Sequence, residues 1–78
     1  MTENRILYEF VKNTHERVRV EFGKYNKFDL VGVRVYFLAN VEKNEWRPTR
    51  KGITMKAELL PELKKGIDKA AREWNKAK

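Results

Sequence analysis

The sequence predicts a single α+β domain of four antiparallel strands followed by one C-terminal helix. Two observations lead to this fold class. As far as Thr54, apolar residues alternate with polar ones or form short strand-like runs between turn formers, and after Met55 they recur with helical spacing. The chain of 78 residues also has the length of one small domain and contains no internal repeat or Gly/Ser-rich linker.

The first two strands are predicted at about residues 5–12 and 16–23. In the first, Ile6, Tyr8 and Phe10 recur with a period of two among other strand-forming residues. In the second, charged and apolar residues alternate strictly from Arg17 to Phe22. Because alternate side chains point to opposite faces of a sheet, this strand has one face for water and one for a core.

The third and fourth strands are predicted at about residues 28–38 and 45–53. The third is long and apolar, and the glycine at position 32 predicts a bend or a bulge there. A polar loop at residues 40–44 precedes the fourth strand, which is irregular. Pro48 cannot donate a hydrogen bond to a neighbouring strand, so the fourth strand is expected at a sheet edge or at a bulge.

The C-terminal helix is predicted at about residues 57–76, where apolar residues form one stripe with spacings of three and four. Thr54 is expected to help start this helix, and Pro61 to lie in its first turn, where a missing amide costs least. A core built from so short a chain is marginal, and no cysteine is present to form a disulfide. We therefore expect a homodimer whose interface contains Leu59, Leu63, Ile67 and Trp74.

The composition restricts the class of partner. The formal net charge is +7, from 18 Lys and Arg against 11 Asp and Glu, and it favours an anionic partner such as nucleic acid or an anionic membrane. No apolar run approaches the roughly 20 residues that span a bilayer, and the N-terminus lacks a signal-peptide pattern. We expect a soluble intracellular protein without a membrane partner, cytoplasmic and nucleoid-associated, or nuclear in a eukaryote.

The residues that usually carry catalysis are almost absent. The chain has no Ser and no Cys, and its single histidine, His15, falls in the first turn. Glu42 and Glu45 lie in a predicted loop, where no apolar pocket would raise a carboxyl pKa. The glycines are too scattered for a phosphate-binding loop. We therefore expect no enzyme activity, no metal site and no cofactor.

The predicted sheet places cations beside aromatic residues. Arg17 and Arg19 share a face because they are two residues apart, and so do Arg34 and Tyr36, whereas Phe37 takes the opposite face unless a bulge intervenes. Such a surface is typical of single-strand binding, in which phosphates follow the cations and bases stack on aromatic rings. The candidates for stacking are Tyr25, Trp46 and Phe37. The alternative is that Tyr36, Phe37 and Trp46 fill the core.

A basic segment, residues 46–54, connects the last loop to the helix. It contains Arg47, Arg50 and Lys51 without an acidic residue, together with Trp46 and a glycine at position 52. Cations neutralise phosphates, and glycine allows close approach of a backbone. An isolated basic run usually has no role beyond contact with water, so the neighbouring strands decide its interpretation.

The order of elements and two motifs, Arg34-Val35-Tyr36-Phe37 and Pro48-Thr49-Arg50-Lys51-Gly52-Ile53-Thr54, resemble the C-terminal domain of the transcriptional coactivator positive cofactor 4 and its small prokaryotic relatives. The resemblance extends from about Arg17 to Ala70. It implies a curved four-stranded sheet, dimerisation largely through the helices, and single-stranded DNA bound along a channel formed by the sheets of the dimer.

The resemblance also implies roles for particular residues. Six of them match backbone-contacting positions of the family, namely Arg17, Arg19, Arg34, Arg50, Lys51 and Gly52. Tyr25 corresponds to an aromatic of the second turn, and Phe37 stands where the family often has Trp. Lys27 and Arg47 match basic positions in one of several registers of the turn. Trp46 falls where the family need not have an aromatic, so its role depends on the basic segment alone.

The sequence thus favours single-stranded DNA binding with little sequence preference, in transcription, replication or repair. Eukaryotic coactivators of the family carry a Ser-rich N-terminal tail that is modified, whereas this chain contains no serine. The DNA-binding domain by itself, as in prokaryotic or viral relatives, is therefore the expected form, with the transcription machinery as a further partner. A protein-interaction or regulatory module, or an RNA-binding protein using the same surface, stays as the alternative.

Overall fold

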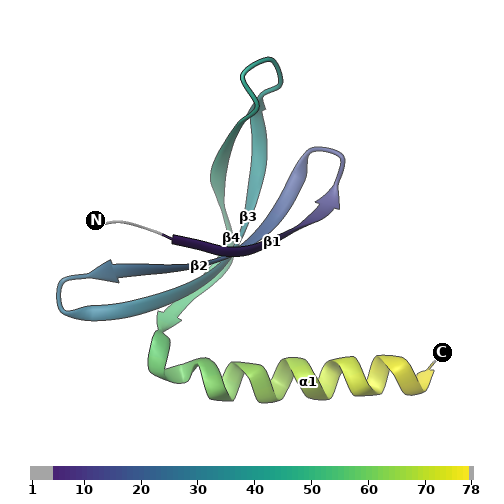
Figure 1. Cartoon of the computed structure of the whole chain (residues 1–78). Helices are drawn as coiled ribbons and strands as arrows, with labels where there is room; N and C mark the ends of the chain where they lie inside the picture. Colours follow the sequence, from purple (N-terminus) through teal and green to yellow (C-terminus); the bar gives the residue numbers. More distant parts are fainter. Residues whose placement is uncertain (1–4, 78) are drawn as a thin grey trace.

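The computed structural model describes residues 5–77 and has the predicted fold class, a curved antiparallel sheet followed by a helix (Figure 1). The strands are neighbours in chain order, β1-β2-β3-β4. Their bounds are Arg5–Asn13 for β1, Glu16–Tyr25 for β2, Phe28–Asn40 for β3 and Glu45–Lys56 for β4. A 3₁₀ turn, η1 (Ala57–Leu59), leads into α1 (Leu60–Ala77). Figure 1 shows α1 along one side of the sheet, with the hairpins pointing away in different directions.

Asparagine occurs at all three strand connections. The side-chain Oδ1 of Asn13 accepts a hydrogen bond from the backbone N–H of His15 at 3.0 Å, which closes the β1–β2 turn. Asn26, between β2 and β3, has φ 56°, and Asn44, between β3 and β4, has φ 52°. Asn tolerates this left-handed conformation better than most residues, so these short connections are compatible with the sequence.

One face of the sheet is apolar and faces α1. Val20 of β2 pairs with Val33 of β3, which in turn pairs with Ile53 of β4, so the three side chains form a row across the strands. A cavity of about 430 Å³ separates this face from α1, and the helix residues lining it include Leu63 and Ile67. The alternation predicted for β2 therefore sets which face meets the helix.

Little of the described chain is buried. Val31 and Tyr36 are the buried apolar residues, Glu21 is the buried charged residue, and α1 contributes none among residues 5–77. Ile67 and Trp74 on α1 are 60% and 63% exposed. In the described part of the chain no helix is both long and apolar enough to cross a membrane. A single chain thus leaves most of its apolar helix face uncovered.

The junction between sheet and helix differs from the prediction. β4 continues to Lys56, and Thr54, expected to help start the helix, lies inside this strand and accepts a hydrogen bond from Arg34. The α-helix begins at Leu60 and not near residue 57, with Leu59 in the 3₁₀ turn. Pro61 does lie in the first α-helical turn, as predicted. Pro61 has no N–H to donate, which favours a helix start at this point.

Of the bend or bulge predicted at Gly32, the bulge is absent at that position. Gly32 pairs regularly with Glu21 on one side and Thr54 on the other. The register of β3 with β4 instead shifts between Arg34 and Tyr36, where β4 has extra residues. Pro48 flanks that bulge and lies on an edge strand, which agrees with its predicted place.

Candidate nucleic-acid interface

The face of the sheet opposite α1 carries a row of arginines. Arg19 of β2 pairs directly with Arg34 of β3, and Arg17 pairs with Tyr36, so all four side chains point to this face. The sequence-based prediction that Arg17 shares a face with Arg19, and Arg34 with Tyr36, is therefore correct. We call this the arginine face.

Arg17 and Arg19 are held by one carboxylate on β1. Arg17 Nη1 donates to Glu9 Oε2 at 2.9 Å, and Arg19 Nε donates to Glu9 Oε1 at 2.8 Å. The hydrogen bond from Arg19 is the main cause that lowers the pKa of Glu9 below its ordinary value. The Arg17 guanidinium also lies 4.5 Å from the centre of the Trp46 ring, and that of Arg19 lies 4.6 Å from the centre of the Tyr36 ring. Both guanidinium groups are thus oriented before any ligand arrives.

Trp46 lies on the arginine face. It is half-buried, its Nε1 donates to Asn44 Oδ1 at 3.1 Å, and Arg17 covers one side of its ring. Tyr36, in contrast, is buried, as the alternative of a core role predicted. Trp46 is therefore an aromatic support for Arg17 that leaves part of its surface accessible.

Arg34 connects the arginine face to the β4 bulge. Its Nη1 donates to the carbonyl oxygen of Thr49 at 3.1 Å, and its Nη2 donates to Thr54 Oγ1 at 2.8 Å. Thr49 is fixed in turn, because its Oγ1 donates to the Val35 carbonyl at 2.7 Å and accepts from the Lys51 N–H at 3.1 Å. The bulge consists of Thr49, Arg50 and Lys51, opposite the single residue Val35. We call these three residues the β4 bulge.

Gly52 closes the bulge, and only glycine fits there. Its φ is +151°, which side chains rarely permit. A Cβ at this position would lie 2.5 Å from the Val33 carbonyl oxygen and 2.8 Å from the Arg34 Cα. The glycine in the basic segment therefore has a structural reason, which is the close approach of β4 to β3 beside Arg34.

The bulge presents two cations to solvent. Arg50 is exposed and has no hydrogen-bond or ion-pair partner within residues 5–77. The Lys51 side chain is 71% exposed, and its Nζ lies 4.0 Å from Glu16 Oε2, at the limit of an ion pair. Charges in this setting are available to phosphates at little cost in broken contacts.

The remaining candidates lie at the ends of the hairpins. Tyr25 is exposed beside the β2–β3 turn. Phe37 pairs with Arg47 on the face opposite Tyr36, so these two residues are separate from the arginine face. Arg47 is held by Glu45, with 2.6 Å between Arg47 Nη2 and Glu45 Oε2.

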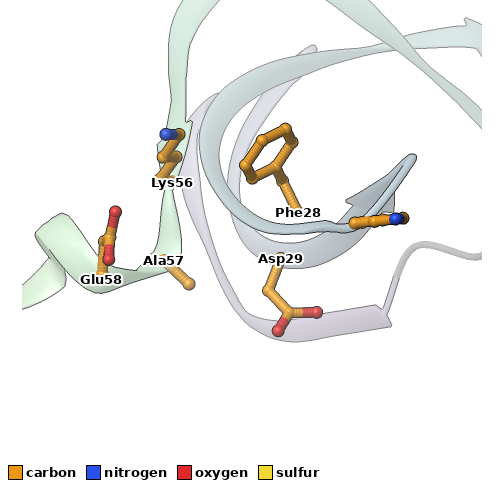
Figure 2. Close-up of a pocket in the computed structure, with 6 residues that line it drawn as sticks. Phe28, Asp29, Lys56, Ala57 and Glu58 are labelled. Carbon is orange, nitrogen blue, oxygen red and sulfur yellow. The ribbon is translucent and has the colours of Figure 1, made fainter.

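Lys27 lines a cavity of about 250 Å³ between the start of β3 and η1 (Figure 2). There the Lys56 ammonium lies 4.6 Å from the centre of the Phe28 ring, and Asp29 and Glu58 complete the wall. Acidic and basic side chains are mixed in this cavity, so it is less suited to phosphate than the bulge. Across residues 5–77 no group of three or more His, Cys, Asp or Glu side chains could hold a metal ion.

Sequence reasoning missed the acidic partners of the arginine face. Tyr36 donates its hydroxyl hydrogen to Glu21 Oε1 at 2.8 Å, and burial together with this bond raises the pKa of Tyr36 to about 12. Glu21 shares the face of Arg17 and Arg19 by the same alternation that located them. Glu9 on β1 could not be placed without the strand register.

The fold and the arginine face are those of a small α+β domain with a basic sheet surface. The profile of the Transcriptional Coactivator p15 (PC4) family matches residues 12–67. The chain belongs to this family, and membership supports a DNA-binding, coactivator-like role.

Solved structures of PC4 homologs have the same fold. BPSL1147, a PC4 homolog from Burkholderia pseudomallei K96243, is 26% identical in its orthorhombic form, with a TM-score of 0.80 over 94% of this chain and 96% of that chain. Its tetragonal form gives 25% identity and a TM-score of 0.79 over 88% and 98%. The bacteriophage T5 homolog of the eukaryotic coactivator PC4, implicated in recombination-dependent DNA replication, is similar in fold at 18% identity, with a TM-score of 0.72 over 95% and 83%. No curated protein sequence matches the chain.

Proposed function

We propose that this chain binds single-stranded DNA with little sequence preference, as a homodimer, in transcription, replication or repair. The β4 bulge is the observation that carries the proposal. It presents Arg50 and Lys51 to solvent. The backbone of the bulge is fixed because Arg34 donates to the Thr49 carbonyl, and Thr49 Oγ1 donates to the Val35 carbonyl and accepts from the Lys51 N–H. Because the backbone beneath these cations is already ordered, binding a phosphate chain costs mainly side-chain conformational freedom.

The arginine face favours an unpaired strand over a duplex. Tyr25 is exposed at the hairpin end, and Trp46, which Arg17 covers on one side, is partly accessible on the arginine face. Unpaired bases stack on such aromatic residues with about 1–3 kcal/mol each, whatever the base, whereas bases in a duplex are already stacked on each other. Because stacking and phosphate contacts do not depend on base identity, little sequence preference is expected.

The uncovered helix supports the proposed dimerisation. α1 buries none of its side chains within the described chain, and Ile67 and Trp74 are exposed on it. The apolar cavity between Leu63 and the sheet indicates that a single chain does not close its own core. A second copy that packs its helix against this one would cover both surfaces.

A fluorescence titration tests the DNA-binding proposal. The tryptophan signal is followed while single-stranded or duplex oligonucleotides of equal length are added at several salt concentrations. We expect tighter binding to the single strand. For about five neutralised phosphates, the logarithm of affinity should fall against the logarithm of salt with a slope of roughly −3.5. Equal binding to duplex, or a flat salt response, would contradict the proposal. A matched ribo-oligonucleotide competitor tests the alternative of RNA binding.

Light scattering tests the dimer. We expect twice the chain mass at micromolar concentration and a shift toward the monomer for Ile67→Asp, because a carboxylate would then be buried against an apolar partner. Glu62→Gln on the same helix is the control, since its side chain is 73% exposed. A mass of 9.3 kDa for the unmodified chain would refute the dimer.

A further inference from the structure

A second cavity opens on the arginine face. It has a volume of about 170 Å³ and is lined by residues of three strands, among them Glu21, Gly23, Gly32, Arg34 and Thr54. Gly32 lies between Glu21 and Thr54 in the strand register, so the missing side chain of this glycine leaves the hollow between them. The cavity therefore lies within the surface to which a nucleic-acid strand would bind.

One side chain that lines this cavity has an unused capacity for hydrogen bonding. Glu21 is 7% exposed, and its Oε1 accepts the bond from the Tyr36 hydroxyl. Its Oε2 is buried and has no hydrogen-bond partner within residues 5–77. Leaving a buried polar atom unpaired is costly, so a ligand that donates to Oε2 gains that energy on binding.

A hydrogen-bond donor and an acceptor line the same cavity. Arg34 lines the same cavity and uses Nη1 and Nη2 for Thr49 and Thr54, but a guanidinium carries five N–H groups, so donors remain. A ligand that matches both residues has an N–H donor next to an acceptor. The Watson–Crick edges of cytosine and adenine have this arrangement, an exocyclic amine beside an unprotonated ring nitrogen.

We propose that this cavity is a base pocket in which an unpaired cytosine or adenine donates its exocyclic N–H to Glu21 Oε2 while Arg34 donates to the adjacent ring nitrogen. This inference extends the proposed single-strand binding and depends on it. It adds a preference at one nucleotide to a surface that otherwise binds any sequence. Uracil reverses the pattern, with a carbonyl at position 4 that faces the carboxylate and a ring N–H that faces the arginine.

The test compares equal-length oligo(dC) and oligo(dU) by fluorescence anisotropy near neutral pH. The two pyrimidines have rings of the same size and differ at positions 3 and 4, which are the positions that the pocket contacts. The quantity measured is the ratio of the two dissociation constants, Kd for oligo(dU) over Kd for oligo(dC). For Glu21→Gln, which keeps the shape and offers an amide N–H, this ratio should fall by about tenfold.

Two further variants make the result decisive. Gly32→Ala places a methyl group in the pocket at ordinary contact distances, 3.5 Å from Thr54 Oγ1 and 3.7 Å from Glu21 Cγ, so the fold should persist while the ratio falls. Glu62→Gln removes the same charge from an exposed position on α1 and should leave the ratio unchanged.

The outcomes separate this inference from the proposed function. If the unmodified chain binds neither single strand, the proposed function fails and the base pocket with it. If it binds both, and the ratio is the same in folded Glu21→Gln and Gly32→Ala as in the unmodified chain, the base pocket alone is refuted. If Glu21→Gln does not fold, Gly32→Ala decides by itself. A fall of the ratio in these variants and not in Glu62→Gln supports the pocket.

Discussion

The cations of this protein fall into two groups with different surroundings. Arg17, Arg19 and Arg34 are tied to a carboxylate, to aromatic rings and to β4, whereas Arg50 and Lys51 extend from the bulge into solvent. The first group fixes the shape of the arginine face and offers its remaining donors in set directions. The second group supplies charge that phosphates can neutralise. Positive residues that look equivalent in the sequence therefore contribute differently to folding and to binding.

The largest loss of stability is expected from a substitution of Gly52, which lies between the two groups of cations. Gly52→Ala would force a Cβ to within 2.5 Å of the Val33 carbonyl oxygen at a φ of +151°. We expect a loss of about 3 kcal/mol or more in the free energy of unfolding, from backbone strain and the clash together. Urea denaturation measures this loss.

The matched control is Gly66→Ala on α1, where a Cβ meets nothing within 4 Å. Alanine there should stabilise the protein by up to about 1 kcal/mol, because it favours helix more than glycine does. A Gly52→Ala variant as stable as the unmodified chain would show that the close contact of β4 with β3 is not needed.

Substitutions of Arg34 and Arg50 test the difference between the two groups of cations most simply. Arg34→Ala removes two hydrogen bonds, to Thr49 and Thr54, and should lower the free energy of unfolding by roughly 2 kcal/mol. Arg50→Ala should change it by less than about 0.5 kcal/mol, since Arg50 has no partner within residues 5–77. Thermal and urea unfolding of both variants give the comparison, and equal costs would contradict the two-group description.

The buried pair Tyr36–Glu21 predicts a pH dependence. The pKa of Tyr36 in the folded protein is raised from 10.0 to about 12, so the folded state holds this proton more tightly than the unfolded state. The resulting stabilisation is complete below about pH 10 and is lost as the pH rises through about 12. Across this range, the free energy of unfolding should fall more steeply for the unmodified chain than for Tyr36→Phe. Parallel curves would show that the hydroxyl is not responsible.

The smallest effect, a change in the affinity for a single strand, is expected from a substitution of Glu9. Its carboxylate competes with phosphate for Arg17 and Arg19, so Glu9→Gln should strengthen binding to a single strand by about two- to threefold. Exposed ion pairs contribute about 0–1 kcal/mol, and stability should change little. The same anisotropy titration with Glu62→Gln corrects for the general effect of removing a negative charge, and an equal gain in both variants would contradict a specific role for Glu9.

The sequence predicted the strands, the fold class and the shared face of Arg17, Arg19 and Arg34, because alternation with a period of two fixes which side chains share a face. It also predicted an irregular fourth strand with Pro48 at an edge or a bulge, but it did not locate the bulge at Thr49, Arg50 and Lys51. The glycine at position 32 looked like the irregular point, whereas Gly52 has the unusual backbone, and single residues do not show how much close contact their neighbours impose.

The side chains that bond to the arginines could not be predicted from the sequence either. Glu9 reaches Arg17 and Arg19 across strands, and its place depends on register shifts in β1. Thr54 was expected at the start of the helix from its local preference, but β4 extends past it and Arg34 uses its hydroxyl. At Thr54, long-range pairing thus outweighed local propensity.

The salt dependence of single-strand binding tests the central claim most directly, namely that the β4 bulge neutralises phosphates. Affinity for one single-stranded oligonucleotide is measured over a range of salt concentrations for the unmodified chain and for the double variant Arg50→Ala, Lys51→Ala. Two lost contacts should make the slope of log affinity against log salt shallower by about 1.4, with the free energy of unfolding unchanged within about 0.5 kcal/mol. The same slope and affinity in both proteins would contradict the claim.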